Sequence, residues 1–298
     1  MSRKLVYLIN PISGVKGKEQ LLEMIRKRTA EKNIPFEILP TNAAGDYTFL
    51  LNKIIAEQIT DVVVCGGDGT VNQVANACRH SAINIGIIPM GSGNGLAFAA
   101  KIPKNSGKAL DVIFKGNAKV IDSFFINDKF SCMLCGLGFD AQVAYDFAKQ
   151  KKRGLMSYVK QTCKNFLSAK PYPFEVSIDG NALNTEAFFI SIANSNQFGN
   201  NFTIAPQASL YDGLLDIVIV NKMNKLRMLL TVLKQIRKGT IDEYDGHDPT
   251  KGIHYFHAKK VEIKNPGNAP LHIDGDPAHT SQVFAINVIE KAFSLLMP

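Results

Sequence analysis

The stretch that decides the fold is DVVVCGGDGTVN, residues 61–72. The apolar run at 62–65 is typical of a strand buried on both faces in a parallel sheet. It passes directly into GGDGT, residues 66–70, and then into a helical pattern. Glycines at a strand-to-helix turn let the backbone approach a ligand closely, and the first turn of the next helix offers N–H groups that suit phosphate. The segment therefore predicts a strand, a phosphate-binding turn and a helix.

Around this segment, apolar strands alternate with amphipathic helices over the first 120 residues or so. We expect strands at 4–9, 35–40, 61–65 and 83–88, and helices at 17–32, 47–58 and 70–79. Such alternation predicts an α/β domain in which helices cover both faces of a parallel sheet. Ligand sites in such domains lie at the carboxyl ends of the strands.

The pattern changes after about residue 123. Apolar segments separated by turn signals predict strands at 124–134, 174–178, 187–193, 214–220, 259–264, 271–273 and 283–288. Two helical stretches interrupt them, near 141–167 and 226–238. We therefore expect a nucleotide-binding α/β domain at 1–123 and a mostly antiparallel β-sandwich domain at 124–288, with about 289–298 packing back on the first.

Composition narrows the classes of partner. The net charge of +8, from 34 basic and 26 acidic residues, suits nucleotide phosphates, an acidic membrane surface or nucleic acid. No helix-turn-helix, zinc-finger or aromatic RNA-binding signature is present, so we expect no nucleic-acid partner. No run approaches the ~18 apolar residues of a membrane-spanning helix, and the first apolar run is too short for a signal peptide. We therefore expect a cytoplasmic protein.

Cysteine usage does not indicate a disulfide framework, because five cysteines in 298 residues is an odd and sparse number. Cys132 and Cys135 form a CxxC pair with apolar residues between them. No second pair accompanies it, so we interpret both as buried strand residues.

Asp68 is unusual within a phosphate-binding turn, because a carboxylate repels an anion. It is understandable as a partner for a magnesium-bound nucleotide, or for a hydroxyl that must lose a proton. The alternative is a tight turn in which the aspartate caps the helix.

Two more glycine-bearing turns follow predicted strands: NPISG at 10–14 and GSGNG at 91–95. Both should lie at the same sheet edge as residues 66–70. The spacing at 91–95 departs from a dinucleotide-binding fingerprint, and residues 14–19 lack the spacing and the Ser or Thr of a P-loop. The three turns together predict a phosphate-binding edge that is neither of these two types.

In this order, Asn-Pro-x-Ser-Gly, Gly-Gly-Asp-Gly-Thr-x-Asn, Gly-Ser-Gly-Asn and a late Asp-Gly-acid resemble the diacylglycerol kinase catalytic-domain family. That family includes soluble bacterial lipid kinases and sphingosine kinases. The likeness runs from Asn10 to Asp276. The Gly-Gly-Asp-Gly-Thr element by itself is shared with NAD kinases and phosphofructokinases. The resemblance implies the two-domain fold of NAD kinases and diacylglycerol kinases, with ATP as phosphoryl donor and a lipid alcohol such as diacylglycerol as acceptor.

The resemblance also implies roles for single residues. Asp276 is expected to be the general base and Asp68 to take part in catalysis. The commoner family pattern has Glu where this chain has Asp276, so the carboxylate is one methylene shorter here. Expected nucleotide-binding residues are Asn10, Pro11, Ser13, Gly14, Thr41, Gly66, Gly67, Asp68, Gly69, Thr70, Asn72, Ser92 and Asn94. A plain turn at Asp274-Gly275 between two strands is the alternative.

Family members hold Mg²⁺ in a loop of the form Asp-Gly-Leu-Leu-Asp, which this chain has at 212–216. The resemblance implies the Asp212 carboxylate and the carbonyls of Ser209 and Leu214 as metal ligands. Such oxygen donors suit a hard cation that keeps several waters. Asp216 is expected to be either a surface residue or a partner of this site.

Lysines and one arginine recur with apolar residues over 149–170, a pattern that suits an anionic membrane surface. A helix packed on the protein with a solvated basic face explains it equally well. The expected partners are a nucleotide and a lipid at the inner membrane face, and the resemblance leaves a homodimer open. Two other functions stay open: an NAD kinase-like phosphotransferase, and an inactive module that binds lipid or nucleotide.

Overall fold

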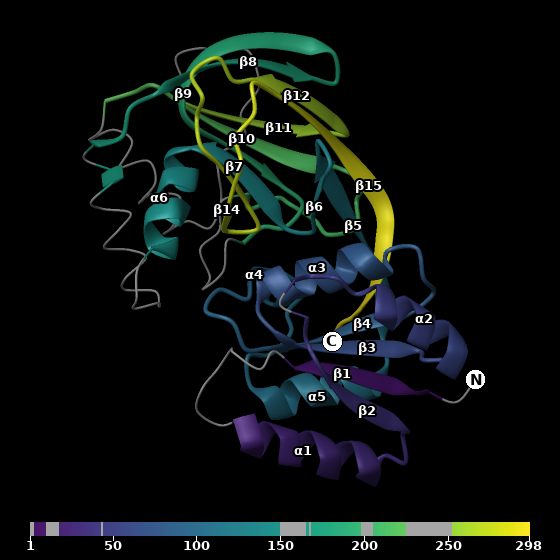
Figure 1. The fold of residues 1–298 in the computed structure, drawn as a ribbon. Helices are drawn as coiled ribbons and strands as arrows, with labels where there is room; N and C mark the ends of the chain where they lie inside the picture. The colour runs from purple at the N-terminus through teal and green to yellow at the C-terminus, as the bar shows by residue number, and fades with distance from the viewer. Residues whose placement is uncertain are drawn as a thin grey trace. The chain divides into compact units, whose positions relative to one another are not determined.

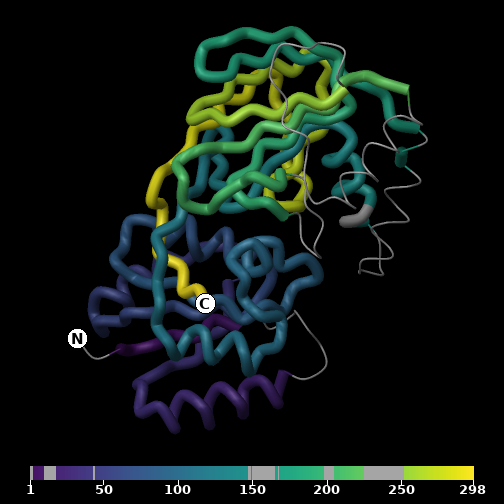
Figure 2. Tube along the Cα trace, turned by 180° about the vertical axis from the view of Figure 1, so that it is seen from behind, coloured from purple at the N-terminus to yellow at the C-terminus, as the bar shows by residue number. Residues whose placement is uncertain are grey.

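The structure is a computed structural model. It describes residues 3–9, 18–42, 44–149, 165–166, 168–197, 205–224 and 252–298. The chain forms two compact units, one of Met1–Asp122 with Glu290–Pro298, the other of Ser123–Ile289. The boundaries expected from the sequence fell after residues 123 and 288. Figure 2 shows the C-terminal end of the chain, in yellow, among the blue elements of the first unit.

In the first unit, strands and helices alternate up to the fourth helix. The elements are β1 (Leu5–Ile9), α1 (Lys18–Glu31), β2 (Phe36–Pro40), α2 (Thr48–Glu57), β3 (Asp61–Gly66), α3 (Asp68–Cys78), β4 (Asn84–Pro89), α4 (Gly95–Ala99) and α5 (Ser106–Lys115). The strands pair in parallel in the order β2-β1-β3-β4. Ser294 and Leu295 near the chain end add a further parallel segment beside β4.

The central strands of this sheet are buried because helices cover both of its faces. Figure 1 shows α1 and α5 on one face of the sheet and α2 and α3 on the other. Every residue of β1 and β3 is buried, because side chains on both faces of these central strands meet helices. On α1 the buried residues Leu21, Ile25 and Thr29 recur every four positions, so one stripe of the helix faces the sheet.

The second unit is antiparallel. Its elements are β6 (Lys129–Ser131), β7 (Leu134–Gly138), α6 (Phe139–Ala148), β8 (Tyr172–Ile178), β9 (Asn181–Ala193), β10 (Leu215–Asn221), β11 (Ile253–Ala258), β12 (Lys260–Lys264), β13 (Leu271–Ile273) and β14 (Asp276–Ala278). Two long strands, β5 (Ala118–Ile126) and β15 (Val283–Leu296), belong partly to each unit.

The strands of this unit enclose one apolar core. They follow the order β14-β13-β7-β9-β8-β12-β15, and β10 lies between β9 and β11. Core side chains come from β5, β7, β8, β9, β10, β11, β12, β13 and β15, among them Phe124, Leu137, Ile190, Ile217 and Phe284. Together the units form a parallel α/β domain and an antiparallel β-sandwich, which confirms the predicted fold class.

Three expected elements need correction or fall outside the described chain. The strand expected at 124–134 is divided, because Asn127 adopts a positive φ of 52° and turns the chain between β5 and β6. The helix expected at 70–79 begins two residues earlier, at Asp68. The helix expected at 141–167 is described only as α6, and the one at 226–238 lies outside the described residues. Within the described part of the chain, no helix is long and apolar enough to cross a bilayer.

Candidate functional site

The carboxyl ends of four parallel strands meet at one edge of the first unit's sheet (Figure 1). Thr41 follows β2, residues 67–70 follow β3, and residues 91–94 follow β4. The Thr41 N–H donates to the Ile9 carbonyl at 3.1 Å, which keeps Thr41 beside the end of β1. The segment after β1, with the predicted residues Asn10, Pro11, Ser13 and Gly14, lies outside the described residues.

The turn between β3 and α3 has almost no length. Gly66 ends the strand, Gly67 is extended (φ −100°, ψ −177°), and the helix begins at Asp68. A helix leaves the N–H groups of its first turn without partners inside the helix, and its dipole favours an anion there. Asp68, Gly69 and Thr70 form this first turn and are half-buried. The arrangement can receive a phosphate group at the N-terminus of α3.

The turn after β4 packs against this one, backbone to backbone. A Cβ atom added to Gly91 would lie 2.6 Å from the Gly67 Cα, a distance that real side chains do not reach. Glycine at position 91 is therefore required by the close approach of the two turns, which brings the glycine motifs at 66–70 and 91–95 together in space.

Asn94 holds the second turn in shape. It is buried, adopts a left-handed conformation with φ of 56°, and forms the N-cap of α4. Its side-chain Oδ1 accepts from the Gly91 N–H at 2.8 Å, and its Nδ2 donates to the Gly91 carbonyl at 2.8 Å. The amide of Asn94 thus closes the turn, whereas Ser92 at its tip is exposed.

Asp68 connects the two turns. Its Oδ1 accepts from the N–H of Leu96 in the first turn of α4 at a long 3.4 Å. Asn72, one turn further along α3, is half-buried on the same helix. The first unit therefore places the carboxylate of Asp68 beside the N–H groups that begin α3, at the edge of the sheet where ligands bind in α/β folds.

Asp276 occupies a second acidic position, in the second unit. It is exposed and begins β14, where it pairs with Ile273 of β13. Only Asp274 and Gly275 separate the two strands, and both have positive φ, 50° and 86°. Two such residues form the tight hairpin turn that matches the twist of the paired strands. The turn alternative thus describes Asp274-Gly275, and it leaves the Asp276 carboxylate at the surface.

Asp274 anchors this hairpin. Its buried carboxylate accepts from the Ser131 hydroxyl at 2.6 Å and from the N–H groups of Met133 and Leu134 at 3.1 and 3.0 Å. Hydrogen bonds from backbone N–H groups to a carboxylate are strong. The turn that presents Asp276 is therefore tied to the segment between β6 and β7.

The third predicted position is the loop before β10. Asp212 is exposed, and its Oδ1 accepts from the Leu214 N–H at 3.1 Å. The Ser209 hydroxyl accepts from the Tyr211 N–H at 3.4 Å. These bonds are local and bend the loop, so the three predicted metal ligands lie within one short turn.

Asp216, the second residue of β10, is fully buried and is not a surface residue. The Tyr255 hydroxyl donates to its Oδ1, and His257 Nε2 lies 3.2 Å from the same atom. Its Oδ2 has no hydrogen-bond partner among the described residues. Burial raises the pKa of Asp216 to about 6, against the lowering effect of the Tyr255 bond.

These residues fit a magnesium ion bound mainly through backbone oxygens and water. In the described ranges, no group of three or more His, Cys, Asp or Glu side chains could hold a metal ion by itself. One exposed carboxylate at Asp212, carbonyl oxygens at Ser209 and Leu214, and the buried Asp216 Oδ2 nearby in sequence are donors of the type that Mg²⁺ prefers. Sequence reasoning missed the burial of Asp216, for which the apolar strand beginning at Leu215 was the available signal.

The two cysteines of the CxxC pair are buried as expected, although only Cys135 lies in a strand. Cys132 and Cys135 are buried and carry no disulfide within the described residues. Burial raises the pKa of the Cys135 thiol well above its ordinary value. Most of the basic segment expected at a membrane, residues 150–164 and 167, lies outside the described chain.

Comparisons with known proteins cover nearly the whole chain. Residues 4–126 match the family model described as "Diacylglycerol kinase catalytic domain". Residues 134–297 match the one described as "YegS C-terminal NAD kinase beta sandwich-like domain". The two matches correspond closely to the α/β unit and the β-sandwich unit.

Individual relatives agree with these matches. The chain is 26% identical over 274 residues to a diacylglycerol kinase of Bacillus subtilis (strain 168), over 90% of this chain and 88% of that protein. It is also 26% identical over 262 residues to the "Probable lipid kinase YegS-like" of Shewanella frigidimarina (strain NCIMB 400), over 86% and 82% of the two chains.

A solved structure supports the fold. The crystal structure of a diacylglycerol kinase from Bacillus anthracis str. Sterne superposes with a TM-score of 0.74 over 99% of this chain and 97% of that one, at 20% identity. The family matches confirm the resemblance seen in the sequence motifs. The chain therefore belongs to the diacylglycerol kinase catalytic-domain family of lipid kinases, which are phosphotransferases with an alcohol acceptor.

Proposed function

We propose that this protein transfers the γ-phosphoryl group of ATP to the hydroxyl of a lipid alcohol such as diacylglycerol. The observation that carries the proposal is the contact between two glycine turns at the N-terminus of α3, where Gly67 and Gly91 meet. We expect phosphate groups to bind beside the first-turn N–H groups of α3, near the carboxylate of Asp68. The printed names of the relatives support a lipid acceptor.

In this proposal the first unit binds the nucleotide. The N–H groups at Asp68, Gly69 and Thr70 stabilise phosphate oxygens, and catalysis of phosphoryl transfer depends mainly on such positioning and electrostatic stabilisation. Thr41, Ser92 and Asn72 contribute polar groups near the same edge. Asn94 acts indirectly, by holding the turn in shape, because both polar atoms of its side-chain amide are hydrogen-bonded to the backbone of Gly91.

Magnesium, when bound, supplies positive charge that neutralises the phosphate oxygens, and the loop of Ser209, Asp212 and Leu214 would hold an ion in the second unit. Asp276 accepts the proton of the acceptor hydroxyl while the oxygen of that hydroxyl forms a bond to the γ-phosphorus. The bond from that phosphorus to the bridging oxygen breaks, and ADP leaves. An exposed carboxylate at the start of β14 can perform this step because it is accessible to the acceptor.

We place the encounter with the acceptor at an anionic membrane surface on the cytoplasmic side. The net charge of +8 is complementary to such a surface. The apolar tails of the acceptor stay in the bilayer while its hydroxyl reaches Asp276.

The test is transfer of labelled γ-phosphate from Mg-ATP into a total lipid extract presented as vesicles. Wild type should label one lipid class, and Asp276→Asn should lower the rate by about 100-fold to 10,000-fold, as loss of a general base does. The matched control is Asp128→Asn, which changes an aspartate in the exposed turn between β5 and β6. It should keep the wild-type rate.

Other outcomes decide between the alternatives. The second unit matches a domain described as NAD kinase-like, so NAD is included as a competing acceptor. Label in NAD and none in lipid would replace the proposal with an NAD kinase. Nucleotide binding without label in either acceptor would contradict catalysis and leave a binding module.

A further inference from the structure

A buried histidine and a buried aspartate lie behind the hairpin that presents Asp276. His272 is in β13, and Asp140 is the second residue of α6. His272 Nε2 lies 3.3 Å from Asp140 Oδ2, and the two residues are 132 positions apart in the chain. Both side chains are almost fully buried. None of the roles proposed above uses this pair.

The hydrogen bonds define where the proton of His272 resides. The Gly275 N–H donates to His272 Nδ1 at 3.3 Å, so Nδ1 must carry a lone pair and no hydrogen. The hydrogen of the neutral ring is therefore on Nε2, which donates it to Asp140 Oδ2. Asp140 Oδ1 in turn accepts from the Ala141 N–H at 2.8 Å, near the start of α6. A continuous chain of hydrogen bonds thus links α6 to the Gly275 backbone.

Close packing allows this chain little freedom. A Cβ atom on Gly136 of β7 would lie 1.9 Å from Asp140 Oδ2 and 2.6 Å from His272 Nε2. The pair therefore fills space that only a glycine at position 136 leaves open. A second bond ties the same helix to the hairpin, because the Tyr145 hydroxyl donates to the Ala278 carbonyl at 2.5 Å. Figure 1 shows α6 beside β14.

We propose that His272 and Asp140 are positioning residues for Asp276. The inference rests on the proposed function, in which Asp276 is the base. Gly275 immediately precedes Asp276, so a fixed Gly275 N–H fixes the backbone from which the carboxylate extends. Asp274, the other residue of the turn, is anchored by hydrogen bonds from Ser131, Met133 and Leu134. Two independent anchors thus hold a two-residue turn.

The short side chain of Asp276 makes this anchoring important. A carboxylate one methylene shorter than Glu has one rotatable bond fewer with which to correct an error in the backbone position. A displacement of about 1 Å in a catalytic group can lower the rate by about 100-fold. We therefore expect the His272–Asp140 pair to affect kcat by holding the backbone of Asp276, and not by binding the nucleotide.

Two substitutions of His272 separate the two bonds of the ring. Counted from Cβ, an asparagine amide reaches the position of Nδ1, and a glutamine amide reaches the position of Nε2. His272→Asn keeps an acceptor for the Gly275 N–H, and His272→Gln keeps a donor for Asp140. We expect His272→Gln to lower kcat by about 10-fold to 100-fold with the KM for ATP nearly unchanged. His272→Asn should recover most of that loss.

A double-mutant comparison tests whether the effect passes through Asp276. In the Asp276→Asn background, His272→Gln should cause almost no further loss, because residues that act as a unit are not additive. His80→Gln is the matched control, since His80 is exposed in the first unit, and it should keep the wild-type kcat. A full additional loss in the Asp276→Asn background would overturn the inference.

A spectroscopic measurement tests the hydrogen-bond chain without any need for activity. In nitrogen NMR of histidine-labelled wild-type protein, the ring that disappears in the His272→Asn spectrum should be neutral, with its hydrogen on Nε2. A hydrogen on Nδ1, or a doubly protonated ring at neutral pH, would overturn the inference. Wild type that phosphorylates no lipid would instead overturn the proposed function and the catalytic role with it, while the spectrum still tests the bond chain. An active wild type with an equally active His272→Gln variant would sink the inference alone.

Discussion

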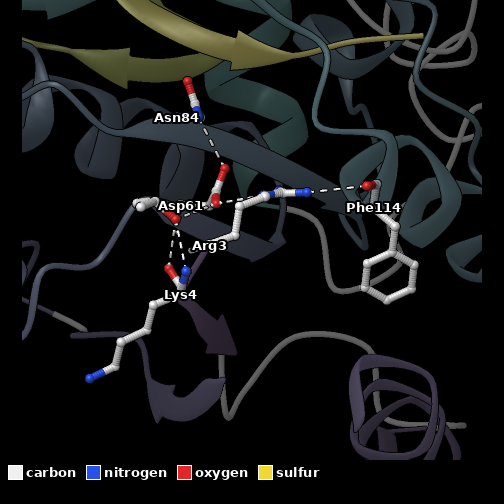
Figure 3. A network of polar contacts seen from close by, with 6 residues as sticks. Arg3, Lys4, Asp61, Asn84 and Phe114 are labelled. Atoms are coloured by element: carbon white, nitrogen blue, oxygen red, sulfur yellow. Dashed lines mark hydrogen bonds and ion pairs between the residues drawn. The ribbon is translucent and has the colours of Figure 1, made fainter. Parts of the chain in front are cut away.

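One strand of the first unit leads to an aspartate at each end, and the two side chains are used differently. Asp61 begins β3 and is fully buried. Its carboxylate accepts from Arg3 Nε at 3.0 Å, from Asn84 Nδ2 at 3.1 Å and from the Thr60 hydroxyl at 2.7 Å (Figure 3). Asp68 lies just beyond the other end, is half-buried, and meets the Leu96 N–H only at 3.4 Å.

The direction of the strands explains the contrast. Helices begin at the carboxyl ends of parallel strands, so their first-turn N–H groups and dipoles collect at that edge. Asp68 lies there, beside groups that suit an anion. At the amino ends of the strands, the chain returns to the sheet and buries its polar groups, which must then be satisfied by protein partners. The same residue type is therefore structural at the amino end of β3, and at the carboxyl end we propose that it faces a ligand.

The largest expected effect is the loss of stability when Asp61, at the amino end of β3, is replaced. Asp61→Ala removes three hydrogen-bond acceptor contacts and leaves Arg3 without its carboxylate. Loss of one partner from a buried ion pair costs about 3–5 kcal/mol, and we expect about 3 kcal/mol because the Arg3 side chain is 26% exposed and can be hydrated. Urea denaturation measures this loss.

The matching expectation for Asp61→Ala concerns activity. Phosphoryl transfer per folded molecule, measured at low temperature where the variant stays folded, should remain near that of wild type. A specific loss of activity at full stability would show that the amino end of β3 also serves the reaction, and the contrast between the two ends would fail.

The second prediction breaks the other end of β3. Asp68→Ala should lower kcat/KM for Mg-ATP by about 100-fold, in the range for loss of one electrostatic or proton-transfer group. The free energy of unfolding should fall by about 1 kcal/mol at most, because the hydrogen bond from the Leu96 N–H to Asp68 is long. Parallel urea curves and rate measurements on the same preparation check both parts. A loss of stability as large as that of Asp61→Ala would identify Asp68 as structural.

The sequence predicted the local structure at the carboxyl end of β3 better than that at the amino end. Glycines next to an apolar strand mark a strand-to-helix turn locally, so residues 66–70 could be assigned from neighbouring letters alone. The start of α3 was placed two residues late, because Gly69 has a poor helix propensity and hides the first turn. Asp61 gave no such signal, since its partners Arg3 and Asn84 are 58 and 23 positions away.

The second unit shows the same division. For the late Asp-Gly-Asp motif, a turn at Asp274-Gly275 was the alternative to a general base at Asp276, and the structure has a hairpin turn there. The pairing of His272 with Asp140 joins residues on different elements, so no local pattern could reveal it. Long-range polar pairs depend on how strands and helices pack, and one sequence read by itself does not contain that register.

The smallest expected effect concerns the contribution of Arg3 to stability at the amino end of β3. Arg3→Lys keeps a positive charge beside Asp61 but removes the bond from Arg3 Nη1 to the Phe114 carbonyl, which is 3.2 Å long. Loss of that bond costs about 1 kcal/mol. Arg3 Nη2 is buried and has no acceptor among the described residues, so its removal relieves a desolvation cost that offsets part of this loss.

We therefore expect Arg3→Lys to lower the free energy of unfolding by less than about 1 kcal/mol, and Arg3→Met by clearly more, because methionine leaves the buried Asp61 without a charged partner. Urea denaturation of the two variants beside wild type measures the difference. Equal losses for lysine and methionine would mean that the planar guanidinium, and not its charge, stabilises this end of β3. A loss confined to methionine would assign the stabilisation of this end of β3 to the charge of residue 3.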